Sequence, residues 1–375
     1  MMARLGDLVT ISSSSEKLKS DTFWLLNLDM VEQQTGNIIE YNYVSKDQLN
    51  GSIIQFDSDV VLYSKLRPNL NKVVLPEQAG FATSEMLPLR PDSSKLLREY
   101  LAVYLRSDSF VTWAVSKTAG AKMPRLGTKE LLGKELSLPS LCEQRKIVSE
   151  FQKINKVIFI RKQQLSKLDE LVKSRFIELF GATSTENCTK QIKDYAEVLG
   201  GYAFKSDLFC ADAIPVIRIS NINNGCVELD YNICFDELFW EQNKRFRVEQ
   251  NDVLMAMSGA TTGKAGIYRE NMPALINQRV ACIRAKDGVA CPTFLFVATQ
   301  LEWMYDLIQE TSAGCAQPNI SGKQIENMPV PDATYEQQQQ FAAFVEQIDK
   351  SKLAIQKSLE KLETLKKALM QKYFV

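Results

Sequence analysis

Two loops in this chain collect small polar and basic side chains that could hold an anion or contact a base. They run over residues 65–72 and 258–264, and segments 122–125 and 317–319 add polar groups at matching positions. Glycine, serine and threonine let a backbone approach a ligand closely, while lysine and arginine can neutralise phosphate or contact guanine edges. The alternative is that each is an ordinary solvated loop. The candidate binding residues are Lys65, Arg67, Asn69, Lys72, Lys122 and Arg125 in the first half, and Ser258, Thr261, Thr262, Lys264, Gln317 and Asn319 in the second.

The second of these loops has glycines and a lysine, as a phosphate-binding P-loop does, but the spacing differs. Gly259 and Gly263 are separated by three residues, and Ala265 follows the lysine. A P-loop needs four residues between its glycines and a serine or threonine after the lysine. We therefore do not expect this loop to bind a nucleotide in that way.

Catalytic chemistry has little support in the composition. The chain contains no histidine, which excludes Ser-His-Asp and Cys-His nucleophiles and histidine-ligated metals. Carboxylates are scattered, and both the N/D-P-P-Y/F motif of adenine methyltransferases and a G-x-G-x-x-G opening a βαβ unit are absent. The eight cysteines include no C-x-x-C pair and match no zinc template. We therefore expect no catalytic residue, no cofactor and no metal, with free thiols in a reducing compartment.

Length and charge limit the class of protein. A chain of 375 residues has room for two or three domains. Lysine plus arginine equals aspartate plus glutamate at 45 each, so any nucleic-acid binding must come from local patches rather than a global positive field. Neither a long apolar run nor a signal peptide is present. We expect a cytoplasmic protein without a membrane span.

An internal repeat relates the two halves of the chain. Residues 119–126 (AGAKMPRL) align with residues 313–320 (AGCAQPNI) at an offset of 194, and residues 154–156 align with 348–350 at the same offset. Around Glu143-Gln144 and Glu336-Gln337 we expect the offset to drift by a residue or two, as a loop indel would cause. Solenoid repeats have periods of about 20–50 residues. A period this long instead indicates a duplicated half-protein.

Each half is expected to contain a mixed α/β domain followed by a long helix, which makes the fold class α+β. Short apolar runs bounded by turn residues predict strands, and apolar residues at helical spacing predict a helix after them. The two domains are expected over residues 1–139 and 182–331. The predicted strands lie near 57–63, 80–83, 250–257 and 274–277, and the predicted helices over 96–105 and 293–307.

Segments 140–181 and 332–375 carry the pattern of long helices. Their apolar residues recur at alternating steps of four and three, which is typical of a coiled coil. One seam needs a partner and the other is available in the same chain, so we expect a long antiparallel two-helix coiled coil. The alternative is two amphipathic helices, each packed on its own domain. The seams are Ile147, Phe151, Ile154, Ile158, Leu165, Leu168, Val172 and Leu179, and Phe341, Val345, Ile348, Ile355, Leu359, Leu362, Leu369 and Tyr373.

Four segments carry a family resemblance. Two are proline-bounded exits into the long helices, at 136–144 (LSLPSLCEQ) and 328–337 (MPVPDATYEQ). Two are strand–loop segments, at 59–68 (DVVLYSKLRP) and 252–264 (DVLMAMSGATTGK). Together with the repeat, and over the whole length, the chain resembles the specificity (S) subunit of type I restriction–modification systems.

The resemblance implies a fold and a function. Two target-recognition domains would be related by a pseudo-two-fold duplication and separated by the antiparallel coiled coil, and each would read one half of a bipartite site in double-stranded DNA. The helices would set the spacing and dock two modification subunits that methylate adenine, with restriction subunits as further partners in systems that have them. The S subunit would itself carry no active site. Residues expected to contact the modification subunits lie outside the seams, at Phe176, Phe180, Met370 and Phe374.

Two alternatives stay open from the sequence. The chain could be a coiled-coil scaffold or adaptor whose domains bind something other than DNA. It could also be an enzyme with an unrecognised active site, which would turn over substrate without a modification subunit. A steep salt dependence of DNA association would separate the DNA-binding hypothesis from the scaffold.

Overall fold

The computed structural model describes residues 2–11, 13, 21–120, 122–312 and 318–374. The chain divides into two compact units. The first comprises Met1–Arg161 with Lys357–Val375, and the second comprises Lys162–Gln356. Within the described residues, no helix combines the length and apolarity needed to cross a membrane.

The first unit is built on two four-stranded sheets, ordered β2-β9-β6-β7 and β4-β3-β8-β5. Its strands are β1 (Met2–Arg4), β2 (Val9–Ile11), β3 (Thr22–Leu26), β4 (Tyr43–Ser45), β5 (Ile53–Phe56), β6 (Val61–Ser64), β7 (Val73–Val74), β8 (Gly80–Thr83), β9 (Met86–Pro91), β10 (Thr118–Ala119), β11 (Arg125–Leu126) and β12 (Glu135–Ser137). Its helices, besides segments of the long ones, are α1 (Arg98–Leu105), α2 (Asp108–Ser116) and α3 (Thr128–Gly133). The expected strands near 57–63 and 80–83 are confirmed as β6 and β8.

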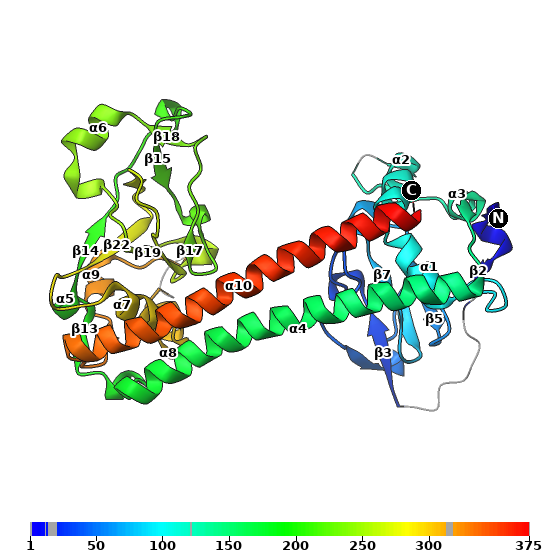
Figure 1. Ribbon diagram of the computed structural model, residues 1–375, viewed down its shortest axis with the longest axis horizontal. Coiled ribbons are helices and arrows are strands. Elements are labelled where there is room, and N and C mark those ends of the chain that lie inside the picture. The colour runs from blue at the N-terminus through cyan, green and yellow to red at the C-terminus, as the bar shows by residue number, and fades with distance from the viewer. Residues whose placement is uncertain (1, 12, 14–20, 121, 313–317, 375) are drawn as a thin grey trace. The chain divides into compact units, whose positions relative to one another are not determined.

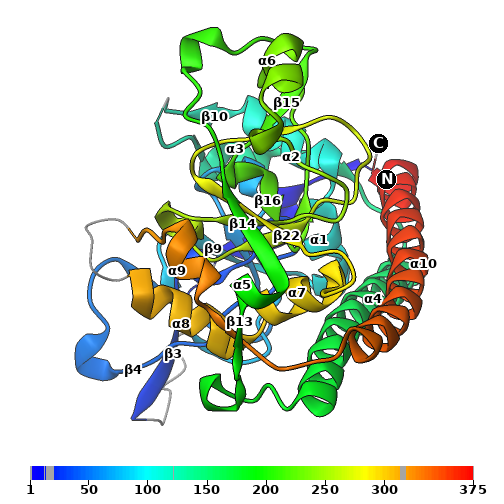
Figure 2. The same cartoon turned by 90° about the vertical axis from the view of Figure 1, so that its left-hand side faces the viewer.

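The second unit contains a six-stranded sheet, β14-β22-β19-β20-β17-β16, and a three-stranded sheet, β18-β15-β21. Figure 2 faces this unit, with β14 running upward from α5. Its strands are β13 (Lys190–Gln191), β14 (Ala196–Gly200), β15 (Ile214–Ile217), β16 (Ile222–Asn223), β17 (Cys226–Val227), β18 (Cys234–Phe235), β19 (Val253–Ala256), β20 (Ala265–Ile267), β21 (Leu275–Ile276), β22 (Val280–Ala285) and β23 (Pro329–Val330). Its shorter helices are α5 (Ile192–Tyr195), α6 (Glu237–Gln242), α7 (Pro292–Thr299), α8 (Glu302–Ser312) and α9 (Gly322–Glu326).

The single helix predicted over 293–307 is wrong, because the chain breaks into α7 and α8 at Gln300. The hydroxyl of Thr299 donates to the carbonyl of Phe296 (2.6 Å), and the N–H of Gln300 donates to Val297 (3.0 Å). These bonds close the last turn of α7 locally, and α8 then starts on its own axis. The first unit makes the same break between α1 and α2.

Two helices of 40 residues each, α4 (Leu141–Phe180) and α10 (Tyr335–Phe374), confirm the predicted long helices. In each unit an α4 segment and an α10 segment lie side by side (Figure 1). In the first unit Phe151 packs on Phe374, with ring centroids 6.2 Å apart. In the second, Phe176 packs on Phe341 at 5.3 Å. Most seam residues are buried or half-buried, but Leu179 is 39% exposed, so the last position of the first seam is wrong.

The aromatic residues near the helix ends fill cores, which corrects the expectation that they are exposed contacts for partner subunits. Phe176, fully buried, and Phe180 both stack against Phe294 and Phe341 at 5.1 to 5.7 Å. In the first unit, Met370 and Phe374 pack against the hydrophobic core. Phe176 has no free surface, and Phe180, Met370 and Phe374 are half-buried, because packing into their own cores already removes most of their apolar area from water.

A buried glutamine fixes the start of each long helix and corrects the expected drift of the repeat. The Gln144 side chain accepts from the N–H of Leu97 (2.9 Å) and donates to the carbonyls of Lys95 and Pro139. The Gln338 side chain accepts from the N–H of Cys291 (2.8 Å) and donates to the carbonyls of Val289 and Ala333. All four pairs of residues are separated by 194 positions. Gln144 therefore matches Gln338, not Gln337, and no loop indel intervenes.

Candidate nucleic-acid interface

In the first unit the loop after β6 is hydrogen-bonded to the strand β11. The N–H of Arg67 donates to the carbonyl of Pro124 (2.8 Å), and the N–H of Leu126 donates to the carbonyl of Lys65 (2.9 Å). Backbone pairing of this kind fixes both segments together, since each buried N–H and C=O needs a partner. The candidate residues of 65–72 and 122–125, which are distant in sequence, are thus brought to one edge of the unit.

The second unit repeats this pairing bond for bond. The N–H of Gly259 donates to the carbonyl of Pro318 (3.0 Å), and the N–H of Ile320 donates to the carbonyl of Met257 (2.9 Å). Pro318 and Ile320 stand 194 positions after Pro124 and Leu126. The loop after β19 and the segment at 318–320 therefore form an edge of the same construction.

One backbone position in this edge has a left-handed conformation in both units. Gly259 has φ +80°, and Arg67, in the equivalent place, has φ +49°. Glycine adopts this conformation without steric cost, whereas a residue with a Cβ is strained there. The first unit therefore holds an arginine where the local fold favours glycine, and strain of this kind at a non-glycine residue is a mark of functional sites.

The side chains predicted for the first edge divide into exposed and internally bonded groups. Arg67, Asn69 and Lys122 are exposed. Lys72 is half-buried, and its amine donates to the carbonyl of Leu28. Burial lowers the pKa of Lys72, partly opposed by a nearby carboxylate. Lys72 is therefore a weaker candidate for a DNA contact than the three exposed residues.

Both remaining basic residues of the first edge face one carboxylate. Glu85 accepts from Arg125, with Nε at 3.1 Å and Nη2 at 3.0 Å from Oε1. Lys65 Nζ lies 4.0 Å from the other oxygen of Glu85. Sequence reasoning missed Glu85, because its role depends on the loop pairing that brings residues 65 and 125 to it.

The second edge holds fewer accessible side chains than predicted. Lys264 and Asn319 are exposed. Thr262 is buried, and its hydroxyl donates to the carbonyls of Gly259 (2.8 Å) and Pro318 (3.2 Å), so its predicted role as a contact residue is wrong in this conformation. The hydroxyl oxygens of Ser258 and Thr261 are buried without a hydrogen-bond partner among the described residues. Gln317 lies outside the described residues.

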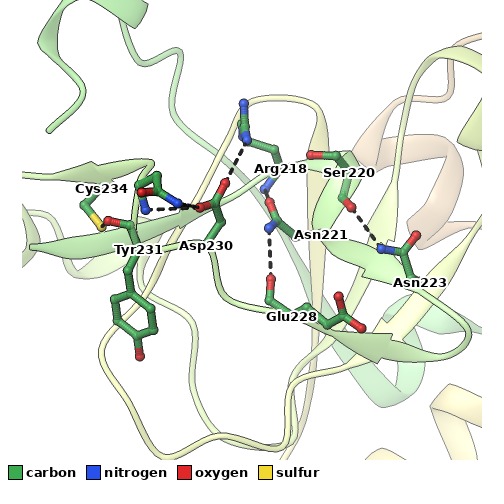
Figure 3. Close-up of polar contacts among 9 residues, drawn as sticks. Arg218, Ser220, Asn221, Asn223, Glu228, Asp230, Tyr231 and Cys234 are labelled. Carbon is green, nitrogen blue, oxygen red and sulfur yellow. Dashed lines mark hydrogen bonds and ion pairs between the residues drawn. The ribbon is translucent and has the colours of Figure 1, made fainter. Parts of the chain in front are cut away.

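Two arginines that the sequence analysis did not select extend this second edge. Strands β15 and β21 are parallel, pairing Ile217 with Ile276. Their carboxyl ends therefore lead to Arg218 and to the exposed Arg279, which is the second residue of the turn after β21. Arg218 lies 3.5 Å from Asp230, and its backbone N–H is capped by Asn221 (Figure 3).

The arrangement is suited to binding. Exposed arginine, lysine and asparagine side chains project from paired loops, as in surfaces that contact phosphates and base edges. Among the described residues no three histidine, cysteine, aspartate or glutamate side chains gather to hold a metal ion.

A family model for the type I restriction modification DNA specificity domain matches this chain twice, over residues 1–170 and 185–367. The chain belongs to this family. Both matched stretches contain one of the paired-loop edges described above. The family resemblance found from the sequence is therefore confirmed.

Similar proteins carry the same description. The chain is 23% identical over 292 residues to the type I restriction enzyme EcoBI specificity subunit of Escherichia coli, covering 69% of this chain and 61% of that one. It is 23% identical over 341 residues to the MjaVIII specificity subunit of Methanocaldococcus jannaschii, covering 86% of this chain and 79% of that one. The chain thus spans less than two thirds of the length of the first relative.

Solved structures share the fold. A chain from a study of complex assembly and conformational transition in the type I R-M system aligns over 100% of this chain and 97% of its own length, with a TM-score of 0.62 and 17% identity. The type I restriction–modification S subunit from M. genitalium aligns over 100% of this chain and 96% of its own length, with a TM-score of 0.59 and 12% identity. At these identities the likeness concerns the fold alone.

Proposed function

We propose that this chain is the DNA specificity subunit of a type I restriction–modification complex, in which each unit reads one half of a bipartite site in double-stranded DNA. The observation that carries the proposal is the paired-loop edge, which recurs with the same hydrogen-bond register in both units. A duplicated edge with different side chains is what reading two different half-sites requires, because base contacts specify sequence while the scaffold only positions them. The family membership supports DNA as the ligand in this proposal.

We further assign four functional regions to the chain. These are recognition domains over 1–139 and 182–331, and helical regions over 140–181 and 332–375. The proposed role of the helices is to set the spacing between half-sites as an antiparallel coiled coil. An insertion of four residues near Gln163-Gln164 rotates and lengthens α4, so it should alter the spacer or abolish binding. An unchanged recognition site after that insertion would contradict this role.

Contacts with the modification subunits are proposed on an exposed apolar patch of α4. Val157, Phe159 and Ile160 are 40%, 59% and 42% exposed on a helix otherwise rich in charge. Exposed apolar groups gathered in one place mark interaction surfaces. Phe159→Ser should reduce co-purification of the modification subunit without loss of helix content, while Gln152→Ser on the same helix should have no effect. If Phe159→Ser still retained the modification subunit fully, we would conclude that this patch is not part of the interface.

The function as a whole is tested by reconstituting the chain with its modification subunits and mapping methylated adenines in exposed DNA. We expect methylation at one bipartite sequence, and binding whose affinity falls steeply as salt is raised, as phosphate contacts require. DNA binding that is absent, or insensitive to salt, would favour the scaffold alternative. Methylation by the chain without modification subunits would show that it is an enzyme.

A further inference from the structure

One position of the paired-loop edge carries opposite charges in the two units. The N–H of Lys65 donates to the carbonyl of Glu85 (3.0 Å), and in the second unit the N–H of Met257 donates to the carbonyl of Arg279 (2.9 Å). Both acceptors occupy the second place of a two-residue turn, after β8 in one unit and after β21 in the other. Glu85 and Arg279 are therefore structural equivalents.

Glu85 holds the guanidinium of Arg125 from one side. Nε lies 3.1 and 3.3 Å from the two carboxylate oxygens, and Nη2 lies 3.0 Å from Oε1. The side chain of Glu85 is 24% exposed and that of Arg125 is 46% exposed. The carboxylate is thus less exposed than the arginine that it holds.

This geometry leaves the other end of the guanidinium available. Arginine has five N–H donors in a rigid fork. The Nε–H and one N–H of Nη2 face Glu85, while Nη1 and the second N–H of Nη2 have no partner among the described residues. Two parallel N–H groups at that end match the O6 and N7 acceptors of guanine in the major groove.

A carboxylate on a surface that only bound phosphate would weaken that binding, since like charges repel. Its presence is accounted for if it restricts the arginine, whose free side chain otherwise loses rotamer entropy on being fixed. Arg279 has no carboxylate partner among the described residues of the second unit. Its exposed cationic side chain is suited to phosphate, where position matters less than charge.

We propose that Arg125, oriented by Glu85, reads a guanine in the half-site bound by the first unit, whereas Arg279 makes a phosphate contact in the other half-site. Glu85 is then a positioning residue that determines specificity without touching DNA. The inference rests on the proposed function, since it names the chemistry of that same interface.

The experiment measures binding of the complex to targets randomised in one half-site at a time. Glu85→Gln removes a negative charge yet frees Arg125, so binding to random DNA should stay equal or strengthen while preference for guanine at one position falls. The expected fall is roughly 5- to 150-fold, the range that corresponds to a bidentate base contact. Arg125→Lys, which keeps the charge but loses the fork, should lose the same preference.

Two control variants separate positioning from charge. Glu135→Gln removes an exposed carboxylate of the same unit, paired with Arg4 at 3.8 Å, and should leave the base preference unchanged. Arg279→Gln should weaken binding on all sequences alike and reduce the salt slope by about 1.

Retention of the guanine preference in Glu85→Gln and Arg125→Lys would overturn the inference, as would loss of a single base preference in Arg279→Gln. If the wild-type complex already lacked a preferred half-site, the failure would instead lie with the proposed function.

Discussion

The two paired-loop edges share a backbone and differ in what they place on it. At the left-handed position the first unit has Arg67 and the second has Gly259. At the following two-residue turn the first has Glu85 and the second Arg279. The scaffold is thus held constant while the side chains vary, which is how one fold can address two different sequences.

At the left-handed position, the residue that best stabilises the backbone is present in only one of the two units. A left-handed residue with a Cβ costs roughly 1–2 kcal/mol relative to glycine. The second unit avoids that cost with Gly259, whose hypothetical Cβ would meet nothing within 4 Å. The first unit accepts the strain at Arg67, so we expect the side chain there to contribute to binding rather than to the fold.

The largest stability effect is expected where the two units are most alike, at the buried glutamines. Gln144→Ala leaves the part-buried N–H of Leu97 and two carbonyls without their partner. Gln338→Ala leaves the buried N–H of Cys291 and the carbonyl of Val289 without theirs, while Tyr195 still donates to the carbonyl of Ala333. Unpaired buried groups cost about 1–3 kcal/mol each, so each variant should lose roughly 3 kcal/mol of unfolding free energy in chemical denaturation. Gln152→Ala, on an exposed turn of α4, serves as the control. If only one of the two glutamine variants lost stability, the two glutamines would not play equivalent roles.

A smaller effect on stability, confined to high pH, is expected at the end of each long helix, where the two units differ in one core residue. Phe374 packs on Tyr100 in the first unit, and Phe180 packs on Phe294 in the second. Burial raises the pKa of Tyr100 to about 12. Because the unfolded chain releases this proton near pH 10, stability should be fully present below pH 10 and fall between pH 10 and 12, by about 1.4 kcal/mol per pH unit.

The alkaline loss is measured by denaturation at pH 9, 10 and 11 (roughly spanning the ordinary tyrosine pKa). Tyr100→Phe, which gives the first unit the residue of the second, should retain more stability above pH 10 than the wild type. Tyr41→Phe, at an exposed tyrosine, should not. If Tyr100→Phe and the wild type lost equal unfolding free energy as the pH rises, Tyr100 would not be the cause of the loss.

The smallest effects test the left-handed position directly. Arg67→Gly should raise the unfolding free energy by up to about 1 kcal/mol, because strain relief exceeds the entropy that glycine adds to the unfolded chain. Gly259→Ala should lower it by about 1 kcal/mol for the opposite reason. Thermal unfolding of the two variants should therefore shift in opposite directions. Destabilisation by Arg67→Gly would show that the side chain supports the fold instead.

The sequence predicted the parts of the fold that depend on local pattern. Heptad spacing gave the two long helices, and short apolar runs gave β6 and β8. It did not predict the break after α7, because apolar residues continue at helical spacing through Leu301 without a glycine or proline. It also misassigned Phe176 and Phe180, since an apolar residue outside a seam can fill the core of an adjoining domain.

The sequence predicted which loops contribute residues to the site, but not how those loops come together. Arg67, Lys264 and Asn319 were selected from residue type and are exposed in the structure. Glu85 and Arg279 were not selected, because a lone acidic or basic residue in a turn carries no signal of its own. Extending the offset of 194 would have aligned residues 83–86 (TSEM) with 277–280 (NQRV) and displayed the charge reversal.

The central claim is that each unit reads its own half-site through its paired-loop edge. It is tested most directly by measuring binding of Arg67→Ala, and of Lys264→Ala combined with Asn319→Ala, to targets randomised in one half-site at a time, with modification subunits present. We expect Arg67→Ala to lose about 1–3 kcal/mol of discrimination at one base pair of one half-site. The double variant should affect only the other half-site. Equal relaxation of both half-sites by either variant would contradict the account.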